Sequence, residues 1–110
     1  MPAYLPDVSV LTLIDLVPEL KGMKSPALKL QMTTYAPGKA GPMHDHRGRP
    51  EAVSVLEGAI TDHRNGVETV FRAGETYTLD NGTAHRMENK GDGPARLLVA
   101  MVWDRDVGSG

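Results

Sequence analysis

Two histidines separated by one residue, His44 and His46, are the side chains whose type and spacing most directly suggest metal chemistry. Side chains two apart on a β-strand point to the same face, so both imidazoles can reach one ion. Glu51 follows a stretch whose Gly and Pro suit a turn, and His85 lies on a later predicted strand, so both could return to that ion. Taken singly, each is better explained as an ordinary solvated or packing residue, and only the joint spacing favours a metal site.

The elements that must position these residues are predicted to be β-strands. Twelve glycines and eight prolines divide the chain into short stretches rich in Val, Thr, Leu and Tyr, which is typical of all-β proteins. Asn65-Gly66 between two such stretches predicts a hairpin, and Asp80-Asn81-Gly82 predicts a turn. The expected strands cover residues 28–35, 52–62, 67–71, 76–79, 83–89 and 95–103, after a strand and short turn within 8–20.

Length and composition restrict the classes of protein to which the chain can belong. The 110 residues form a single domain, 1–110, with a flexible tail at 108–110. The net charge of -2, without a basic stripe, argues against nucleic-acid binding. There is no cysteine, so any metal must be bound by nitrogen and oxygen. The chain has neither a membrane-length apolar run nor a secretory signal, so we expect no membrane partner and a cytoplasmic location.

The spacing of these residues matches two short motifs along residues 38–58 and 74–89. The matching residues are Gly38, His44, His46, Glu51 and Gly58 in the first motif, and Gly74, Gly82, His85 and Asn89 in the second. One expected proline is replaced by Asp80, which also starts turns well. Over both motifs the chain resembles the cupin superfamily, in particular its small single-domain microbial members with a cupin 2 type conserved barrel.

The resemblance implies an all-β jelly-roll barrel, also called a double-stranded β-helix, with metal ligands at His44, His46, Glu51 and His85. This ligand set suits one divalent transition metal, with Mn or Fe favoured and Ni or Zn possible, and no further cofactor is expected. The resemblance also implies a homodimer formed through the outer sheets. The strand at 95–103 agrees with this, because it is apolar on both faces and both should be covered.

Two functional hypotheses remain open from the sequence. The first is a small metalloenzyme that acts on a small organic molecule at open metal positions, as a dioxygenase or oxidase or as an isomerase or lyase. The alternative is a non-catalytic cupin that binds or senses a small ligand and uses its metal structurally. No catalytic acid or base stands out from the sequence, and Tyr35 is only a remote candidate.

Several neighbours of the motifs have two readings each. Met32 and Met43 could join Met87 in an apolar pocket lining or simply pack in the core. Arg47 and Arg49 could attract a substrate carboxylate, although solvated loop charges are the commoner case. His63, beside the predicted hairpin turn, is expected at the surface and not among the ligands.

Overall fold

The computed structural model describes residues 5–46, 48–80 and 84–105, and in these ranges the protein consists of nine β-strands. The strands are β1 (Asp7–Asp15), β2 (Pro26–Tyr35), β3 (His44–Asp45), β4 (Glu51–Glu57), β5 (Ala59–Arg64), β6 (Val67–Arg72), β7 (Thr76–Leu79), β8 (Ala84–Glu88) and β9 (Ala95–Asp104). Arg47, most of the turn predicted at 80–82 and the tail at 108–110 lie outside the described residues. Among those that are described, no helix is both long and apolar enough to cross a membrane.

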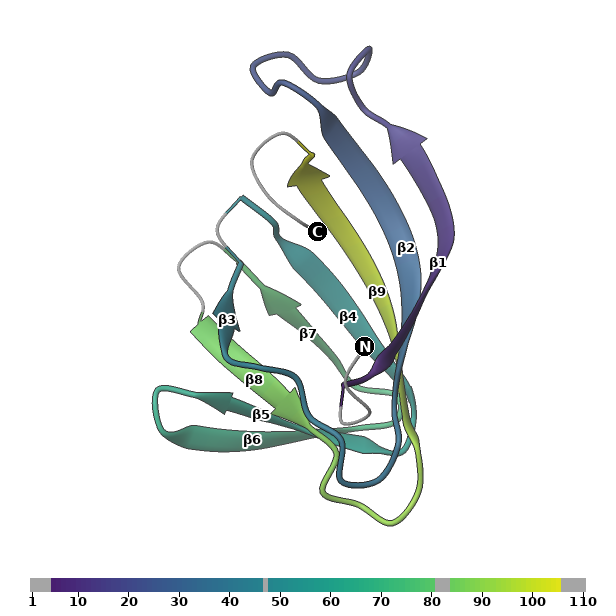
Figure 1. Cartoon of the computed structure of the whole chain (residues 1–110), viewed down its shortest axis with the longest axis vertical. Coiled ribbons are helices and arrows are strands. Elements are labelled where there is room, and N and C mark those ends of the chain that lie inside the picture. Colours follow the sequence, from purple (N-terminus) through teal and green to yellow (C-terminus); the bar gives the residue numbers. More distant parts are fainter. Residues whose placement is uncertain (1–4, 47, 81–83, 106–110) are drawn as a thin grey trace.

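The strands form two antiparallel sheets that face each other (Figure 1). The larger sheet has the order β1-β2-β9-β4-β7 and the smaller has the order β3-β8-β5-β6. Strands distant in sequence are neighbours, and β2 pairs with β9 over ten successive residues from Pro26–Asp104 to Tyr35–Ala95. This arrangement confirms the predicted double-stranded β-helix.

The transition between the sheets occurs at Gly58. The sequence pattern predicted one strand over 52–62, but β4 ends at Glu57 in one sheet and β5 begins at Ala59 in the other. Gly58 has a φ of 74°, and a Cβ there would collide with the carbonyl oxygen of Pro94. The chain therefore changes sheets at a residue that lacks a side chain. The next turn, Asn65-Gly66, has positive φ at both positions and closes the predicted β5–β6 hairpin.

The core lies between the two sheets and is built from alternate residues of each strand. In β9, for example, Leu97, Val99 and Met101 are at most 4% exposed. In β2 the pattern is inverted: polar residues face inward, while Leu28, Leu30 and Met32 face outward. The predicted methionine lining is therefore wrong for Met32 and for Met43, which is 56% exposed, whereas Met87 does face the interior.

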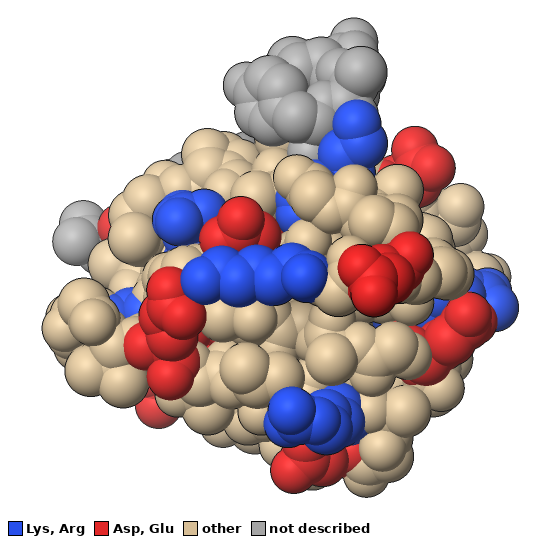
Figure 2. Space-filling view, turned by 90° about the horizontal axis from the view of Figure 1, so that it is seen from below, with Lys and Arg blue, Asp and Glu red and all other residues tan. Residues whose placement is uncertain are grey.

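The outer surface differs between the two sheets. All nine residues of β1 are exposed, among them Val8, Val10, Leu11, Leu13 and Ile14. On the face shown in Figure 2, in contrast, acidic and basic side chains alternate over a largely uncharged surface. Among the described surface charges, Lys90 lies 2.8 Å from Glu68, and His63 lies beside the same carboxylate.

Candidate metal centre

The short strand β3 and its partner β8 bring the predicted histidines together. His44 lies directly opposite His85 in the β3–β8 pairing, and His46 follows immediately after β3. The chain then turns, with the amide of Arg49 donating to the carbonyl of His46, and Glu51 is the first residue of β4. The β3–β8 pairing and the turn before β4 therefore bring together four residues that span more than forty positions of the sequence.

The imidazoles of His44, His46 and His85, called here the histidine cluster, face one another. Their ring centroids are 4.8 to 4.9 Å apart, and one nitrogen from each lies within 4.8 Å of the other two. His46 and His85 are each 1% exposed, whereas His44 is partly exposed at the mouth of the site. The cluster can thus bind a metal ion from inside the barrel.

Each imidazole is held by an oxygen acceptor on its Nδ1 side. The Nδ1 of His44 donates to the carbonyl of Pro42 at 2.9 Å, and that of His46 donates to the carbonyl of Arg49 at 3.2 Å. The Nδ1 of His85 donates to Oδ1 of Asp62 at 2.8 Å. Because an oxygen acceptor requires a proton on the nitrogen, the three Nε2 atoms of the neutral rings carry lone pairs.

The Nε2 atoms of His46 and His85 are only 2.9 Å apart. With both Nδ1 atoms protonated, two lone pairs meet at this distance, and only a shared cation makes the contact favourable. Two nitrogens each about 2.1 Å from one metal ion and at right angles are about 3.0 Å apart. The spacing and the neutral nitrogen donors therefore fit a divalent transition metal.

Asp62 is a functional residue that the sequence did not reveal. It is 1% exposed on β5 and lies between His85 and Arg64, whose Nε donates to Oδ2. A carboxylate on the far nitrogen of a ligating histidine fixes its tautomer and ring orientation. Within the sequence Asp62 is only an inward-facing acid four residues after a motif glycine, and no motif position marks it.

Glu51 lies beside the histidine cluster but on a different side. Its Oε2 is 3.4 Å from Nδ1 of His46, the nitrogen that points away from the other rings, and 3.6 Å from Nη1 of Arg49. Burial raises the pKa of Glu51 to about 7, against the opposing charges of Arg49 and Lys29. The structure thus brings three predicted ligands together and places the fourth next to them.

Burial also favours the neutral form of His46 and His85. It lowers the pKa of His46 to about 4, and the neighbouring Arg49, His85 and His44 charges act in the same direction. It lowers the pKa of His85 as well, although Asp62 opposes the shift. Because neutral imidazole is the form that binds metals, the buried rings are ready to act as ligands near pH 7.

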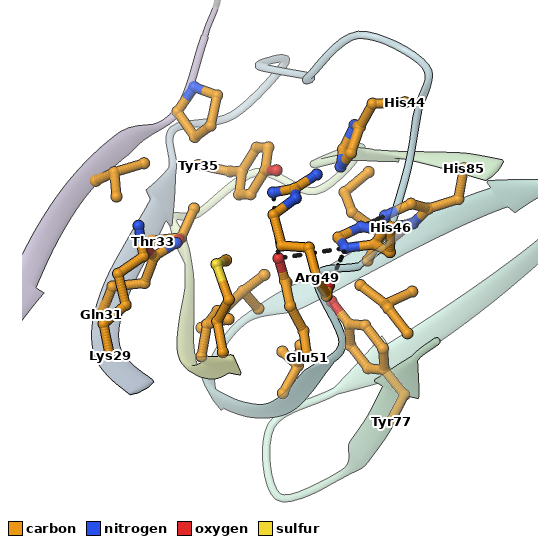
Figure 3. Close-up of a pocket in the computed structure, with 18 residues that line it drawn as sticks. Lys29, Gln31, Thr33, Tyr35, His44, His46, Arg49, Glu51, Tyr77 and His85 are labelled. Carbon is orange, nitrogen blue, oxygen red and sulfur yellow. Dashed lines mark hydrogen bonds and ion pairs between the residues drawn. The ribbon is translucent and has the colours of Figure 1, made fainter. Parts of the chain in front are cut away.

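The histidine cluster opens into a cavity of about 350 Å³ inside the barrel (Figure 3). Contrary to the commoner reading of a loop arginine, Arg49 lines this cavity, and its Nη2 donates to the carbonyl of Asp45. Tyr35 also lines it, with a pKa raised by burial to about 12, so its hydroxyl keeps its proton. The motif residue Asn89 is instead structural, because it bonds the backbone of Tyr35, Gly91 and Gly93.

Comparison with known sequences finds relatives among plant and bacterial proteins. Germin-like protein 1-1 of Oryza sativa subsp. japonica is 31% identical over 90 residues, which are 76% of this chain and 41% of that protein. The oxalate-binding protein of Thermotoga maritima is 30% identical over 66 residues, covering 60% of this chain and 54% of the relative. The chain spans about 40% of the length of the germin-like relatives.

Comparison with solved structures supports the same fold. A protein with a double-stranded β-helix domain from Klebsiella pneumoniae subsp. pneumoniae superposes with a TM-score of 0.73 at 22% identity, over 98% of this chain and 84% of its own. At this identity the likeness establishes the fold alone. The cupin domain family matches residues 31–101, which include both sequence motifs and the whole histidine cluster. With most of its length matched in this way, the chain belongs to the cupin family.

Proposed function

We propose that this cupin is a metal-dependent enzyme that holds one divalent transition metal, Mn or Fe favoured, through His44, His46, His85 and Glu51. The convergence of three imidazoles, each fixed by an oxygen on Nδ1, is the observation that carries the proposal. An ion of this kind supplies Lewis acidity and, for a redox-active metal, electron transfer to a small molecule bound beside it.

The cavity gives the chain's own residues distinct roles in this proposal. Arg49 and Lys29 provide positive charge that attracts and orients an anionic substrate. Tyr35 retains its proton at neutral pH and so acts as a hydrogen-bond donor. The buried walls, including Val53 and Leu97, exclude water from the space next to the histidine cluster.

The name of one relative favours a second candidate, a binding protein without turnover. The Thermotoga maritima protein is described as binding oxalate, which is a small anionic ligand. The same cavity and the same metal would serve that role, with the ion fixing the ligand and stabilising the fold. Oxidase, dioxygenase, isomerase and lyase activities are then absent, although metal and ligand still bind.

The experiment begins with metal analysis of the purified protein and of two variants. We expect one equivalent of Mn or Fe in the wild type, a loss of metal in His46→Ala, and full occupancy in His63→Ala. His63 is a matched control because it lies away from the cluster, with Nε2 2.9 Å from Glu88. Wild-type protein without a transition metal after reconstitution would refute the metal site.

Assays of the metal-replete protein then separate the two candidates. Oxygen consumption and product analysis over a panel of small carboxylates, phenols and enols should reveal turnover that His46→Ala lacks. Ligand binding without oxygen consumption or chemical change across the panel would favour the binding protein.

The exposed apolar face of the larger sheet supports a homodimer as part of the proposal. On this outer face Ile14 of β1 is 50% exposed and pairs with Leu28 of β2, which is 38% exposed, and both lie beside Leu30 and Ala100. Contiguous apolar surface of this kind is typical of protein interfaces. Light scattering should give twice the chain mass, and Ile14→Asp should shift it to the monomer; a monomeric wild type at micromolar concentration would contradict the dimer.

A further inference from the structure

One wall of the cavity is polar and lies away from the histidine cluster. Lys29, Gln31 and Thr33, called here the β2 wall, alternate along β2 and point inward. In Figure 3 they lie across the cavity from the three histidines, with Arg49 and Glu51 between the two sides. The proposed function uses the charge of Lys29 but gives Gln31 and Thr33 no role.

Gln31 is the most unusual member of the β2 wall because it is buried without a full set of partners. It is 9% exposed, and its Oε1 has no hydrogen-bond partner. Its Nε2 makes only a long contact of 3.4 Å with Oγ1 of Thr33. An unsatisfied buried amide costs free energy, so a group in the cavity that pairs with it is favoured.

A hydroxyl is the ligand group that suits this amide best. The unpartnered Oε1 requires a donor, and if the amide is turned over, Nε2 at that position requires an acceptor. A hydroxyl can be either, whereas a carboxylate can only accept. The position of Gln31 therefore favours a ligand that carries a hydroxyl.

The charges around the cavity favour an anion at the other end of the ligand. Arg49 and Lys29 provide two positive charges, and Glu51 provides at most one negative charge. Among the described carboxylates, none lies within ion-pair distance of Lys29, whose ammonium instead sits 4.6 Å from the Trp103 ring centre. One positive charge therefore remains in excess even when Glu51 is ionised, and a metal ion would add to it.

We infer that the cavity binds a small hydroxycarboxylate, with its carboxylate toward Lys29 and Arg49 and its hydroxyl at Gln31. The cavity volume of about 350 Å³ suits a molecule of a few carbons. This inference deepens the proposed function, on which it rests for the ligand's place beside the metal. It distinguishes the ligand from a simple monocarboxylate and from a dicarboxylate that lacks a hydroxyl.

Calorimetric titration with matched three-carbon acids tests the inference. Lactate and 3-hydroxypropionate are compared with propionate, which lacks the hydroxyl, with glycerol, which lacks the charge, and with oxalate. We expect one of the hydroxy acids to bind about tenfold more tightly than propionate, as a hydrogen bond to a buried polar group predicts. Equal affinities for all three monocarboxylates, or tightest binding of oxalate, would overturn the inference.

Variants assign the preference to the β2 wall. Gln31→Met should reduce the hydroxy acid to the affinity of propionate, while Lys29→Met should weaken all acids about tenfold and leave glycerol unchanged. Thr34→Val, on the outward face of the same strand, is the matched control and should behave like the wild type. A preference that survives Gln31→Met would show that the hydroxyl is recognised elsewhere.

Titrations of metal-free and Co²⁺-loaded protein separate this inference from the proposed metal function. A hydroxy acid can also chelate a metal directly, but the part of the preference that depends on Gln31 should persist without metal. Failure to bind Co²⁺ together with an intact preference for the hydroxy acid refutes the metal function alone. Normal Co²⁺ binding without that preference refutes the inference alone.

Discussion

The histidine cluster and the β2 wall face the same cavity, but they differ in how many of their polar atoms have hydrogen-bond partners within the protein. Every Nδ1 of the cluster donates to an oxygen supplied by the protein, from Pro42, Arg49 or Asp62. On the β2 wall the oxygen of Gln31 has no partner. The rings of the histidine cluster are therefore held in place before a ligand binds, whereas the β2 wall retains an unpaired hydrogen-bond acceptor.

This difference separates two kinds of functional residue. A group that must be held in place before an ion arrives needs its own supporting partners. A group that recognises a ligand must keep one bonding position free until the ligand binds. The comparison predicts that substitutions in the cluster reduce metal affinity, while those in the β2 wall change ligand preference at little cost in stability.

The largest effect is expected from removing a ring of the cluster. His85→Ala deletes one of three converging nitrogens and leaves Asp62 buried beside an empty space. Affinity for Mn²⁺ should fall by more than about 100-fold, which is the upper range for loss of a mere supporting partner. Competition with a chelating dye measures the affinity. If His85→Ala binds Mn²⁺ with the same affinity as the control His63→Ala, the histidine cluster is not the metal site, and its distinction from the β2 wall is wrong.

The next largest effect is expected on the pH dependence of stability, through the carboxyl group of Glu51 beside the cluster. The pKa of Glu51 is about 7 in the folded protein and near 4.5 when unfolded, so the folded state holds the proton more tightly. Its contribution to stability is therefore present below pH 4.5 and is lost as the pH rises through 7, by roughly 3 kcal/mol. The lowered pKa values of His46 and His85 have the opposite effect over part of this range, because folding then releases their protons. Urea unfolding of metal-free protein between pH 5 and 8 should therefore show the decline as a falling stability of the wild type relative to Glu51→Gln.

Glu51→Gln is the control for that pH dependence. The variant has no titrating carboxyl at this position but keeps the buried histidines, so the difference in stability between the two proteins isolates the contribution of Glu51. A difference that stays constant between pH 5 and 8 would assign the effect to other groups.

A smaller loss of metal affinity is expected from replacing Asp62, the carboxylate that accepts a hydrogen bond from His85. Asp62→Asn keeps an oxygen near Nδ1 but turns an N–H donor toward either His85 or Arg64, both of which also donate. Metal affinity should fall about 10- to 100-fold, while the three ligand rings remain present. Asp92→Asn, exposed in the loop before β9, is the matched control. Unchanged affinity in Asp62→Asn would show that the negative charge of Asp62 does not support metal binding.

The smallest effect is expected on the β2 wall. Gln31→Met replaces a buried amide by an apolar side chain of similar length and removes the unpartnered oxygen. The free energy of unfolding should stay the same or rise by up to about 1 kcal/mol in the absence of ligand. Chemical denaturation measures it. A marked loss of stability would mean that the amide supports the fold and is not reserved for a ligand.

The sequence was informative where chemistry depends on spacing. The pair His44 and His46, the turn before Glu51 and the distant His85 are recognisable because a metal requires them together, and the Asn65-Gly66 hairpin is recognisable because its backbone demands those residues. The barrel followed from the same motifs. The role of Glu51 as a ligand stays a prediction, since its carboxylate lies on the Nδ1 side of His46.

The sequence was least informative about which face of a strand points inward. Leu28, Leu30 and Met32 alternate with polar residues, and alternation alone does not identify the inner face. In this barrel β2 lines an interior cavity with polar side chains, so the usual assignment of apolar residues to the inside is reversed there. Asp62 escaped notice for a related reason: its partner, His85, is 23 residues away and becomes its neighbour only when β5 pairs with β8.

The motif glycines differ in how much variation they can accept. A side chain at Gly58 would run into the backbone of Pro94, whereas a Cβ at Gly38 or Gly74 meets nothing within 4 Å and is opposed only by the positive φ. In a library with all amino acids at each position, asparagine and aspartate should be recovered at 38 and 74, because they tolerate that backbone conformation. Position 58 should return glycine alone, so this chain should accept the least amino-acid variation at the point where its two sheets separate.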